Sequence, residues 1–190
     1  MKKEVSIVIP CYNEEQTIAQ VIGDFSCQLP QAQIYVYDNN SSDRTAELAK
    51  AQGAIVRFVG KQGKGHVVRQ MFSEIEADYY IMVDGDDTYG AADVHSLLAP
   101  ALSGNADMVV GNRLENSVYD KTQTRPFHSF GNRLVSFLVS RIFSHLIRDT
   151  MTGYRVFTRY CVRSLSVSSG GFDVETEITC QCLNRRMRIV

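Results

Sequence analysis

Short apolar runs alternate with amphipathic segments through the first two-thirds of this chain, and this alternation restricts its possible folds more than any other feature. The runs are rich in β-branched and aromatic residues, as expected of strands that are covered on both faces. Strands that alternate with helices predict an α/β fold with a mostly parallel central sheet flanked by helices. In such sheets, ligands bind beyond the carboxyl ends of the strands. The expected strands are 5–9, 34–37, 55–59, 79–83 and 108–110.

The segments between the expected strands carry helix signals. Asn13 with Gln16 forms a plausible capping box, and apolar residues at helical spacing follow it. Ser42 is placed to cap a second helix, which Gly53 ends, because glycine readily adopts the conformation needed at a helix terminus. Further helices are expected after Gly65 and from about Asp93.

Length and composition fit a single globular domain. The chain has 190 residues, of which 44% are hydrophobic and 22% charged, so it can bury a sizeable core. The formal net charge of -1 gives no basic footprint, and we therefore expect no nucleic-acid partner. Five cysteines without paired CxxC spacing indicate reduced thiols in a cytoplasmic protein.

The two ends of the chain carry different signals. The first apolar run is short and meets Pro10, so it is expected to be a buried strand and not a signal peptide. No stretch approaches the roughly 18 apolar residues of a membrane span. Residues 186–190 are typical of the start of a further strand, which leads us to expect that the sequence is cut from a longer protein.

The strongest chemical signal is the acidic turn Asp84-Gly85-Asp86-Asp87, directly after the strand expected at 79–83. Carboxylates two residues apart at a strand end can face the same side, and the glycine between them lets a ligand come close. Such a pair suits Mg²⁺ or Mn²⁺, with water and substrate phosphates as the remaining ligands. The alternative is an acidic turn in which one aspartate caps the next helix, but three acids there repel one another without a cation.

Two weaker signals lie at other strand ends. Asp38 follows the second expected strand, where an acid can accept hydrogen bonds from a base or ribose, although an Asx turn also explains this polar run. Gly63-Lys64-Gly65 opens a helix, and a helix N-terminus with a lysine attracts phosphate. An ordinary turn explains the second signal equally well, and the spacing is not that of a Walker loop.

The order and spacing of these motifs resemble the inverting family 2 glycosyltransferases, which have the GT-A fold, a Rossmann-like nucleotide-diphospho-sugar transferase fold. The chain is most similar to the polyprenyl-phosphate or dolichyl-phosphate sugar synthases within that family. The resemblance implies one GT-A catalytic domain over residues 1–190, truncated before membrane helices. The motifs that carry it are SIVIPCYNEE, YDNNSSDRT, GKG and YIMVDGDDTY, followed by VVGNRL, DTMTGYRVFTR and GFDVETEI.

The resemblance also implies roles for individual residues. Asp86 would bind the divalent metal, Mg²⁺ or Mn²⁺, together with Asp84 and Thr88. Arg155 would face phosphates, for which its planar fork is suited. Many lipid-phosphate sugar synthases continue the metal motif as Asp-Leu-Gln, whereas this chain has Asp86-Asp87-Thr88, which leaves the sugar and the acceptor open. The residues that would bind the donor nucleotide are Pro10, Tyr12, Glu14, Asp38, Lys64, Asp84 and Arg113.

The implied reaction is a single displacement that inverts the anomeric carbon of a nucleoside-diphosphate sugar, with UDP favoured over GDP. A divalent ion and arginines lower the barrier as negative charge develops on the leaving diphosphate. A sugar hydroxyl as nucleophile needs a general base, for which Asp149 is the first candidate and Asp87 the second. A lipid phosphate needs none, because its second pKa is near ~6. The chain has no Trp and lacks the Gln-x-x-Arg-Trp motif of processive synthases, which favours transfer of one sugar.

The acceptor remains open between alternatives that depend on one helix. A helix expected from about 130 to 147 has an apolar face opposite Arg133, Arg141 and Arg148. If it lies in a membrane interface, the enzyme works at the cytoplasmic face of a membrane on a lipid phosphate. If it packs on the sheet, a soluble transferase with a saccharide hydroxyl as acceptor fits better. A nucleotide-sugar-binding protein without catalysis is a third alternative, which the intact acidic turn disfavours.

Overall fold

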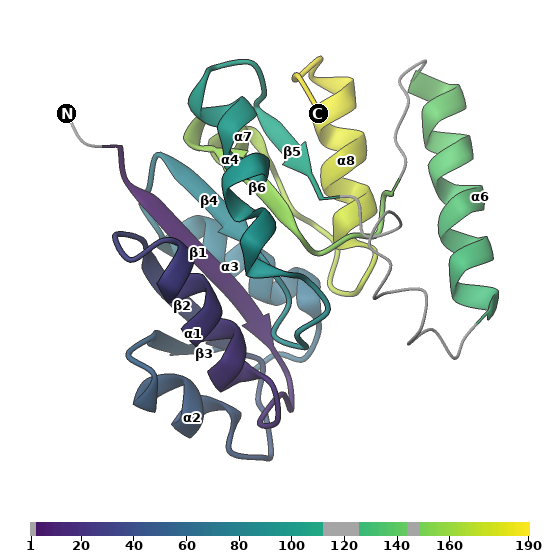
Figure 1. The fold of residues 1–190 in the computed structure, drawn as a ribbon. Coiled ribbons are helices and arrows are strands. Elements are labelled where there is room, and N and C mark those ends of the chain that lie inside the picture. The colour runs from purple at the N-terminus through teal and green to yellow at the C-terminus, as the bar shows by residue number, and fades with distance from the viewer. Residues whose placement is uncertain (1–2, 112–125, 144–148) are drawn as a thin grey trace.

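The computed structural model describes residues 3–111, 126–143 and 149–190, and at its centre is a six-stranded sheet (Figure 1). The strand order is β3-β2-β1-β4-β6-β5. The first four strands pair in parallel, whereas β6 runs antiparallel to both β4 and β5. The predicted α/β class with a mostly parallel sheet is confirmed. The strands are β1 (Val5–Cys11), β2 (Gln33–Asp38), β3 (Ile55–Phe58), β4 (Tyr79–Met82), β5 (Met108–Val110) and β6 (Arg155–Thr158).

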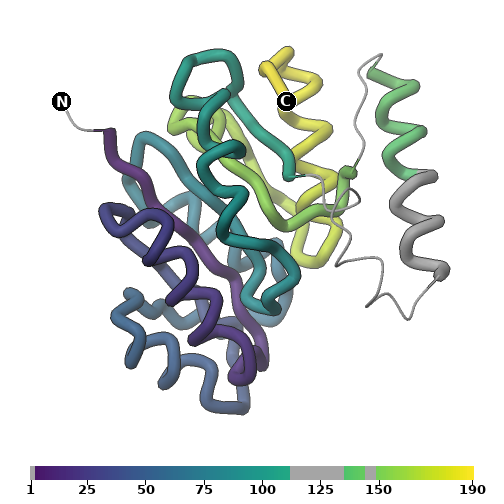
Figure 2. Tube along the Cα trace, viewed as in Figure 1, coloured from purple at the N-terminus to yellow at the C-terminus, as the bar shows by residue number. Residues whose placement is uncertain are grey.

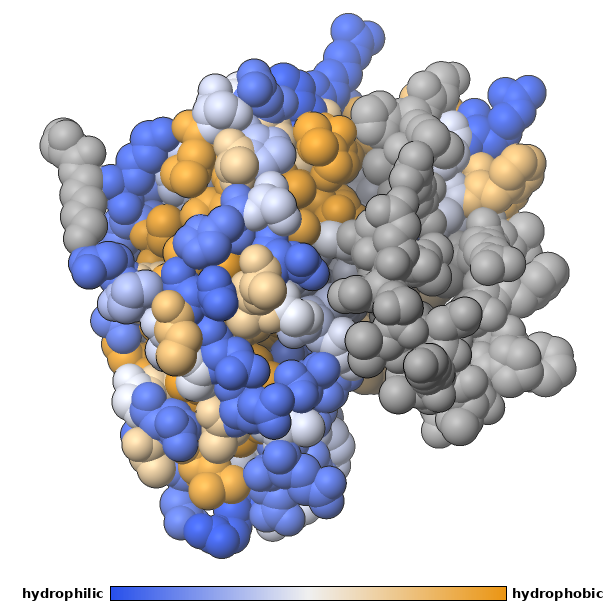
Figure 3. Space-filling view, in the orientation of Figure 1, coloured by the Kyte–Doolittle hydropathy of each residue, from blue (hydrophilic) through white to orange (hydrophobic). Residues whose placement is uncertain are grey.

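Helices cover both faces of the sheet. The helices α1, α2 and α4 pack on one face, and α3, α7 and α8 pack on the other (Figure 1). The surface around α1 and α2 is mainly hydrophilic (Figure 3), because these helices turn only one side toward the core. The helical elements are α1 (Ile18–Gln28), α2 (Thr45–Ala51), α3 (Lys64–Glu74), the 3-10 helix η1 (Ala91–Asp93), α4 (Val94–Leu102), α6 (Pro126–Phe143), α7 (Arg159–Ser164) and α8 (Val174–Asn184).

Burial on both faces explains why the strands read as continuous apolar runs. In β1, Ile7 and Ile9 share a core with α1, whereas Val8 belongs to the core that contains α3. All three side chains are fully buried, and they alternate because successive residues of a strand point to opposite faces. The chain runs outward from β1 to β3 and then returns to β4 on the other side of β1. The carboxyl ends of β1 and β4 therefore meet at the point where ligands bind in such sheets.

The strand β6 was not predicted, and its direction matters for the site. It lies between β4 and β5, with Met82 and Val110 both opposite Arg155. Because β6 is antiparallel to its neighbours, its amino end lies at the edge of the sheet where β4 ends. The segment 149–154, which leads into β6, is thereby brought to the carboxyl edge of the parallel strands.

The predicted starts of the first two helices are wrong. Asn13 does not cap α1: it adopts a φ of 56°, and its side chain accepts a hydrogen bond from the Ser42 backbone N–H at 2.8 Å. Ser42 does not cap α2, which begins at Thr45, whose N–H donates to Asp43 instead. Glu14 N–H also donates to the hydroxyl of Thr45 at 2.7 Å. The polar loops after β1 and β2 thus bind each other across the sheet edge, and these long-range bonds replace the local caps.

The helix α6 lies beside α8, away from the sheet (Figure 2). Its inner side includes Ser136 and Val139, which are buried, whereas Phe137, Leu138 and Ile142 are exposed. The structure therefore splits the apolar face expected for this helix, because a buried serine takes part of the inner side. Among the described residues, no helix is both long and apolar enough to cross a membrane. The expected residues 144–147 of this helix, with Arg148, lie outside the described residues.

The carboxyl-terminal residues pair with the edge strand β5. Ile189 bridges Met108 in the parallel direction, and the N–H of Val190 donates to the carbonyl of Met108 at 3.1 Å. The N–H of Val110 donates to the carbonyl of Val190 in return. This pairing agrees with the strand signal in residues 186–190.

Candidate active site

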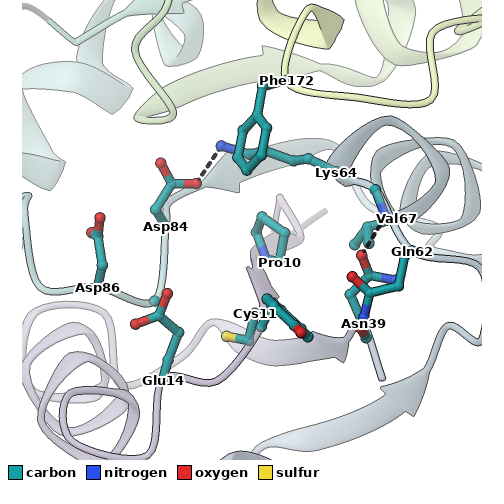
Figure 4. A pocket seen from close by; sticks show the side chains of 13 residues that line it. Pro10, Cys11, Glu14, Asn39, Gln62, Lys64, Val67, Asp84, Asp86 and Phe172 are labelled. Carbon is teal, nitrogen blue, oxygen red and sulfur yellow. Dashed lines mark hydrogen bonds and ion pairs between the residues drawn. The ribbon is translucent and has the colours of Figure 1, made fainter. Parts of the chain in front are cut away.

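A pocket of about 480 Å³ lies at the carboxyl edge of the sheet, where β1 and β4 end (Figure 4). Its lining comes from the segments after β1, β2 and β4, from the start of α3, and from the segment before α8. Residues from five distant parts of the sequence therefore meet in one cavity, at the place that the sheet topology predicts. They are Pro10, Cys11, Tyr12, Glu14, Asn39, Gln62, Gly63, Lys64, Val67, Asp84, Gly85, Asp86 and Phe172.

Six of the residues predicted for the site line this pocket: Pro10, Tyr12, Glu14, Lys64, Asp84 and Asp86. Asp38, Asp87, Thr88, Asp149 and Arg155 do not belong to its lining. Arg113 lies outside the described residues, so its expected place beside phosphates stays a prediction.

Three carboxylates converge on the pocket from β1 and β4. Burial, together with Asp86 and Asp84, raises the pKa of Glu14 to about 7. Figure 4 shows Glu14, Asp86 and Asp84 on the same side of the pocket, with Asp84 above the other two. These three carboxylates repel one another, and a bound divalent cation would relieve that repulsion.

Two glycines make room for this arrangement. A Cβ added at Gly153 would overlap the carboxylate of Asp84, so the segment before β6 must carry a glycine where it passes this acid. A Cβ at Gly85 would lie 2.7 Å from the Sγ of Cys11, which is too close for a real contact. The glycine of the acidic turn thus allows β4 to pack against β1, in addition to the ligand access that the sequence indicated.

Lys64 joins two acids behind the pocket. Its Nζ lies 2.5 Å from Oδ1 of Asp84 and 2.6 Å from Oε1 of Glu175. Burial by itself would lower the pKa of Lys64, but Asp84 and Glu175 outweigh it, and the pKa of the ammonium group stands well above its usual value. The ion pairs with Asp84 and Glu175 explain why Lys64 can stay charged although its ammonium group is shielded from water.

Glu175 was not predicted as a site residue. It lies in the first turn of α8, and its side chain is almost completely buried. In the sequence it is one of several acids in a polar helix, and only the packing of α8 against α3 brings it to Lys64.

The glycines beside Lys64 serve the contact with another part of the chain. A Cβ at Gly65 would overlap the carbonyl oxygen of Ser169, and one at Gly63 would overlap that of Gly170. The N–H of Gly63 donates to Oδ1 of Asn39 at 2.8 Å. Close backbone approach at this turn, which the sequence indicated for a ligand, is therefore used here by the loop before α8.

The end of β2 contributes an acid and an amide. Asp38 is buried, and its Oδ2 accepts a weak hydrogen bond from Ser41 at 3.4 Å, whereas its Oδ1 has no hydrogen-bond partner among the described residues. Asn39, which was not predicted, donates to the carbonyls of Val59 and Lys61. Asn39 thereby holds the loop before α3 at the rim of the pocket.

The structure places the side chain of Arg155 in a different environment from the one expected. It was expected to face phosphates, but its side chain is fully buried in this structure. Nε donates to the carbonyl of Thr152 at 3.0 Å, Nη2 to that of Thr150 at 2.7 Å, and Nη1 to the hydroxyl of Thr179 at 2.9 Å. The guanidinium therefore ties the segment 149–154 to α8, which is a positioning role.

Of the two predicted bases, Asp149 is buried beside this network and Asp87 lies at the surface. Asp149 Oδ1 accepts the N–H of Met151 at 3.0 Å. Asp87 has a φ of 60°, and its pKa is raised by burial and by the nearby Asp24 and Asp86. The N–H of Thr88 donates to Oδ1 of Asp86 at 3.0 Å, which sets the direction of that carboxylate.

The residues present fit a bound Mg²⁺ or Mn²⁺ of the kind that substrate phosphates complete. Within residues 3–111, 126–143 and 149–190, no group of three or more His, Cys, Asp and Glu side chains forms a ready cage for a metal. Such a cage is not required, because Mg²⁺ is commonly held by one or two carboxylates together with substrate phosphates and water. Asp86 and Asp84 would supply these oxygens, and Glu14, whose pKa is raised by burial and by these two acids, lies beside them.

Comparison with known proteins identifies the family. The sequence profile described as glycosyl transferase family 2 matches residues 6–165. The chain belongs to this family. Protein RfbJ of Shigella flexneri is 52% identical over 112 residues, which cover 59% of this chain and 87% of RfbJ. Glycosyltransferase AglJ of Haloferax volcanii is 37% identical over 185 residues, which cover 97% of this chain and 60% of AglJ.

More distant matches include a dolichyl-phosphate glucosyltransferase and a solved structure of the same fold. Dolichyl-phosphate beta-glucosyltransferase of Mus musculus is 27% identical over 210 aligned positions, which cover 95% of this chain and 64% of that protein. Glucosyl-3-phosphoglycerate synthase from Mycobacterium tuberculosis, solved with UDP, superimposes with a TM-score of 0.78 at 24% identity and covers 96% of this chain and 66% of that one. The expected GT-A fold and family are confirmed, and the chain spans about three-fifths of AglJ and of the mouse enzyme.

Proposed function

We propose that this family 2 glycosyltransferase moves one sugar from a nucleoside-diphosphate sugar, with UDP favoured, to the phosphate of a polyprenyl lipid. Binding of the nucleotide-sugar donor is supported by one observation, the convergence of Asp84, Asp86 and Lys64 in one pocket at the carboxyl edge of the sheet. Two acids and a buried cation form a site for a metal-bound diphosphate.

The pocket provides separate places for the parts of a donor. Pro10 and Tyr12 line the end nearest β2. Asp38 lies outside this lining and its Oδ1 is buried without a hydrogen-bond partner among the described residues, so this carboxylate would have to turn toward the pocket to accept a base N–H or a ribose hydroxyl. Asp84 and Asp86 would hold Mg²⁺ or Mn²⁺ at the diphosphate end. When bound, the ion would stabilise the negative charge that develops on the leaving diphosphate. Lys64 holds Asp84 in place by a buried ion pair, so this carboxylate is oriented before a ligand arrives.

The burial of Asp149 supports a phosphate as the acceptor. A hydroxyl nucleophile needs a base within hydrogen-bond reach, and Asp149 is buried with Oδ1 bound to the backbone. A lipid phosphate is already ionised at neutral pH and needs no such base. The name of the mouse relative, a dolichyl-phosphate transferase, supports the same choice.

The outer side of α6 supports a membrane as the place of reaction. Phe137, Leu138 and Ile142 are exposed, and Ile142 has 73% of its surface accessible. Arg141 is exposed next to them and carries a positive charge. Apolar residues beside a cation are suited to the boundary between acyl chains and anionic headgroups. We place the enzyme at the cytoplasmic face of a membrane on this ground.

A transfer assay tests the proposal. The chain is incubated with Mn²⁺, labelled UDP-glucose or GDP-mannose, and polyprenyl phosphate in vesicles, and the label is counted in the organic phase. We expect lipid-linked label that Asp86→Asn abolishes. Ile142→Asp should reduce transfer to vesicle-bound lipid but not nucleotide binding. Label only on a soluble hydroxyl compound, lost in Asp149→Asn, would instead establish the soluble transferase, and nucleotide binding without any transfer would support the non-catalytic alternative.

A further inference from the structure

We propose that the ring of Phe172 is the platform on which the sugar of the donor stacks, an inference that rests on the proposed function. Phe172 lines the pocket, yet 82% of its surface is exposed. In Figure 4 the ring stands next to Lys64 at the mouth of the pocket and has no other labelled side chain against its outer face. An aromatic ring that is both exposed and turned toward a pocket is a candidate contact for a ligand.

The backbone of the segment that leads to Phe172 is held by hydrogen bonds from α3 and α8. Arg69 donates to the carbonyl of Val167 at 2.7 Å and to that of Ser168 at 2.8 Å. The carboxylate of Glu177 accepts the N–H groups of Ser168 and Ser169, both at 2.9 Å. Bonds from two helices thus hold the backbone of this loop just before Phe172.

The same loop is fixed relative to the rest of the pocket. Its carbonyls at Ser169 and Gly170 pack against Gly65 and Gly63, where side chains larger than hydrogen would overlap them. The backbone from which Phe172 extends is therefore placed close to Lys64 and the diphosphate end. Aromatic side chains contribute contact area at low entropic cost, since the ring loses little freedom when a ligand binds.

The position of the ring favours the sugar over the other parts of the donor. Phe172 lies beside Lys64, whose ammonium is bound to Asp84. The diphosphate of such a donor joins the nucleoside at one end to the sugar at the other, and because the end lined by Pro10 and Tyr12 is assigned to the nucleoside, the side of Phe172 is left for the sugar. A hexose has one face made mainly of C–H groups, which can lie on an aromatic ring while its hydroxyls point toward polar side chains. Phenylalanine has no polar group, so it supplies this face contact alone.

Calorimetric titration of UDP, UDP-glucose, GDP and GDP-mannose in Mn²⁺ tests the inference. The comparison uses the nucleotide that the wild-type chain binds and the matching nucleotide sugar. We expect Phe172→Ala to lower the affinity for the nucleotide sugar about five-fold, or by about 1 kcal/mol at 25 °C, and the affinity for the free nucleotide by less than about two-fold. Phe172→Tyr should restore affinity and Phe172→Leu should not. Tyr160→Ala is the matched control, because Tyr160 is also an exposed aromatic residue and lies on α7, at the opposite edge of the sheet.

The possible results distinguish a failure of the stacking role of Phe172 from a failure of the proposed function. Equal weakening of nucleotide and nucleotide sugar would place the ring on the nucleoside and overturn the platform alone. Unchanged affinity for both would also overturn it, since the ring then contacts no part of the donor. A wild-type chain that binds none of the four ligands would overturn the proposed function itself.

Discussion

The buried ammonium group of Lys64 organises the acids of the site. Shared by Asp84 and Glu175, it neutralises a carboxylate that is expected to meet the donor and its metal. A cation that binds at Asp84 would compete with Lys64 for that oxygen. Glu175 gives Lys64 a second partner, which would keep the ammonium group charged and in place if a cation took its share of Asp84.

Removing the charge of Glu175 should therefore lower the stability of the fold. Glu175→Gln leaves the buried ammonium with one ionic partner, and we expect the free energy of unfolding to fall by about 1–3 kcal/mol in urea denaturation. Glu47→Gln is the matched control, because Glu47 pairs with Arg44 on the surface, where water screens the charges, and its loss should change the free energy of unfolding much less. Equal effects of the two substitutions would show that the buried pair adds nothing to stability.

The pKa of Glu14 gives a pH dependence whose sign can be stated. Its folded-state pKa of about 7 lies above the usual value of 4.5, so between these values the folded chain keeps a proton that the unfolded chain has lost. The contribution of Glu14 to stability therefore falls as the pH rises through this window. In metal-free thermal unfolding, Glu14→Gln should gain stability relative to wild type from pH 5 to pH 8.

A control with a lowered pKa should behave differently. The hydrogen bond from Arg44 lowers the pKa of Glu47, so the difference between Glu47→Gln and wild type should stay constant above pH 5. A flat difference for Glu14→Gln as well would contradict the crowding of carboxylates around the pocket.

The contact between α3 and the loop before α8 determines the shape of the pocket at the scale of whole elements. Neither element could form this side of the pocket alone, because Lys64 comes from α3, whereas Phe172 lies in the loop before α8 and Glu175 in the first turn of α8. The two approach closely only because Gly63 and Gly65 lack side chains.

A pair of glycine substitutions tests this packing. Gly65→Ala would place a methyl group on the Ser169 carbonyl, and we expect a loss of about 1–3 kcal/mol in the free energy of unfolding together with weaker nucleotide binding. Gly23→Ala in α1 meets nothing within 4 Å and should stabilise the chain by about 0.5–1 kcal/mol, since alanine favours a helix. If Gly65→Ala also stabilised the chain, the loop would not be fixed against α3.

The sequence was sufficient for the parts of the fold that depend on local patterns. The strands β1 to β5 were recognised because each is a run buried on both faces, and the acidic turn was recognised because it follows one of them directly. The helix caps were misassigned because Asn13 and Ser42 bind each other's loops, which no local pattern reveals. The strand β6 was missed because four residues between two strands, antiparallel to both, carry no periodic signal of their own.

Residues of the site were harder to predict where their roles depend on packing between distant elements. Arg155 looked like a phosphate ligand, but hydrogen bonds to Thr150 and Thr179 hold it in the interior. Glu175 and Asn39 looked like ordinary polar residues, and only the folded chain shows that one binds Lys64 and the other the loop before α3. Spacing along the chain thus found the acids at strand ends, whereas the residues that position them required the structure.

The whole molecule brings the ends of three parallel strands and the segment before α8 together around one pocket, and the central claim is that this pocket holds a metal-bound nucleotide. Calorimetric titration of UDP and GDP into the chain, with Mn²⁺ and then with chelator, tests it most directly. We predict that one nucleotide binds in Mn²⁺ and that its affinity falls more than about ten-fold with chelator or in Asp86→Asn, but not in Glu47→Gln. Binding that is indifferent to metal and to Asp86, or no binding of either nucleotide, would contradict the account.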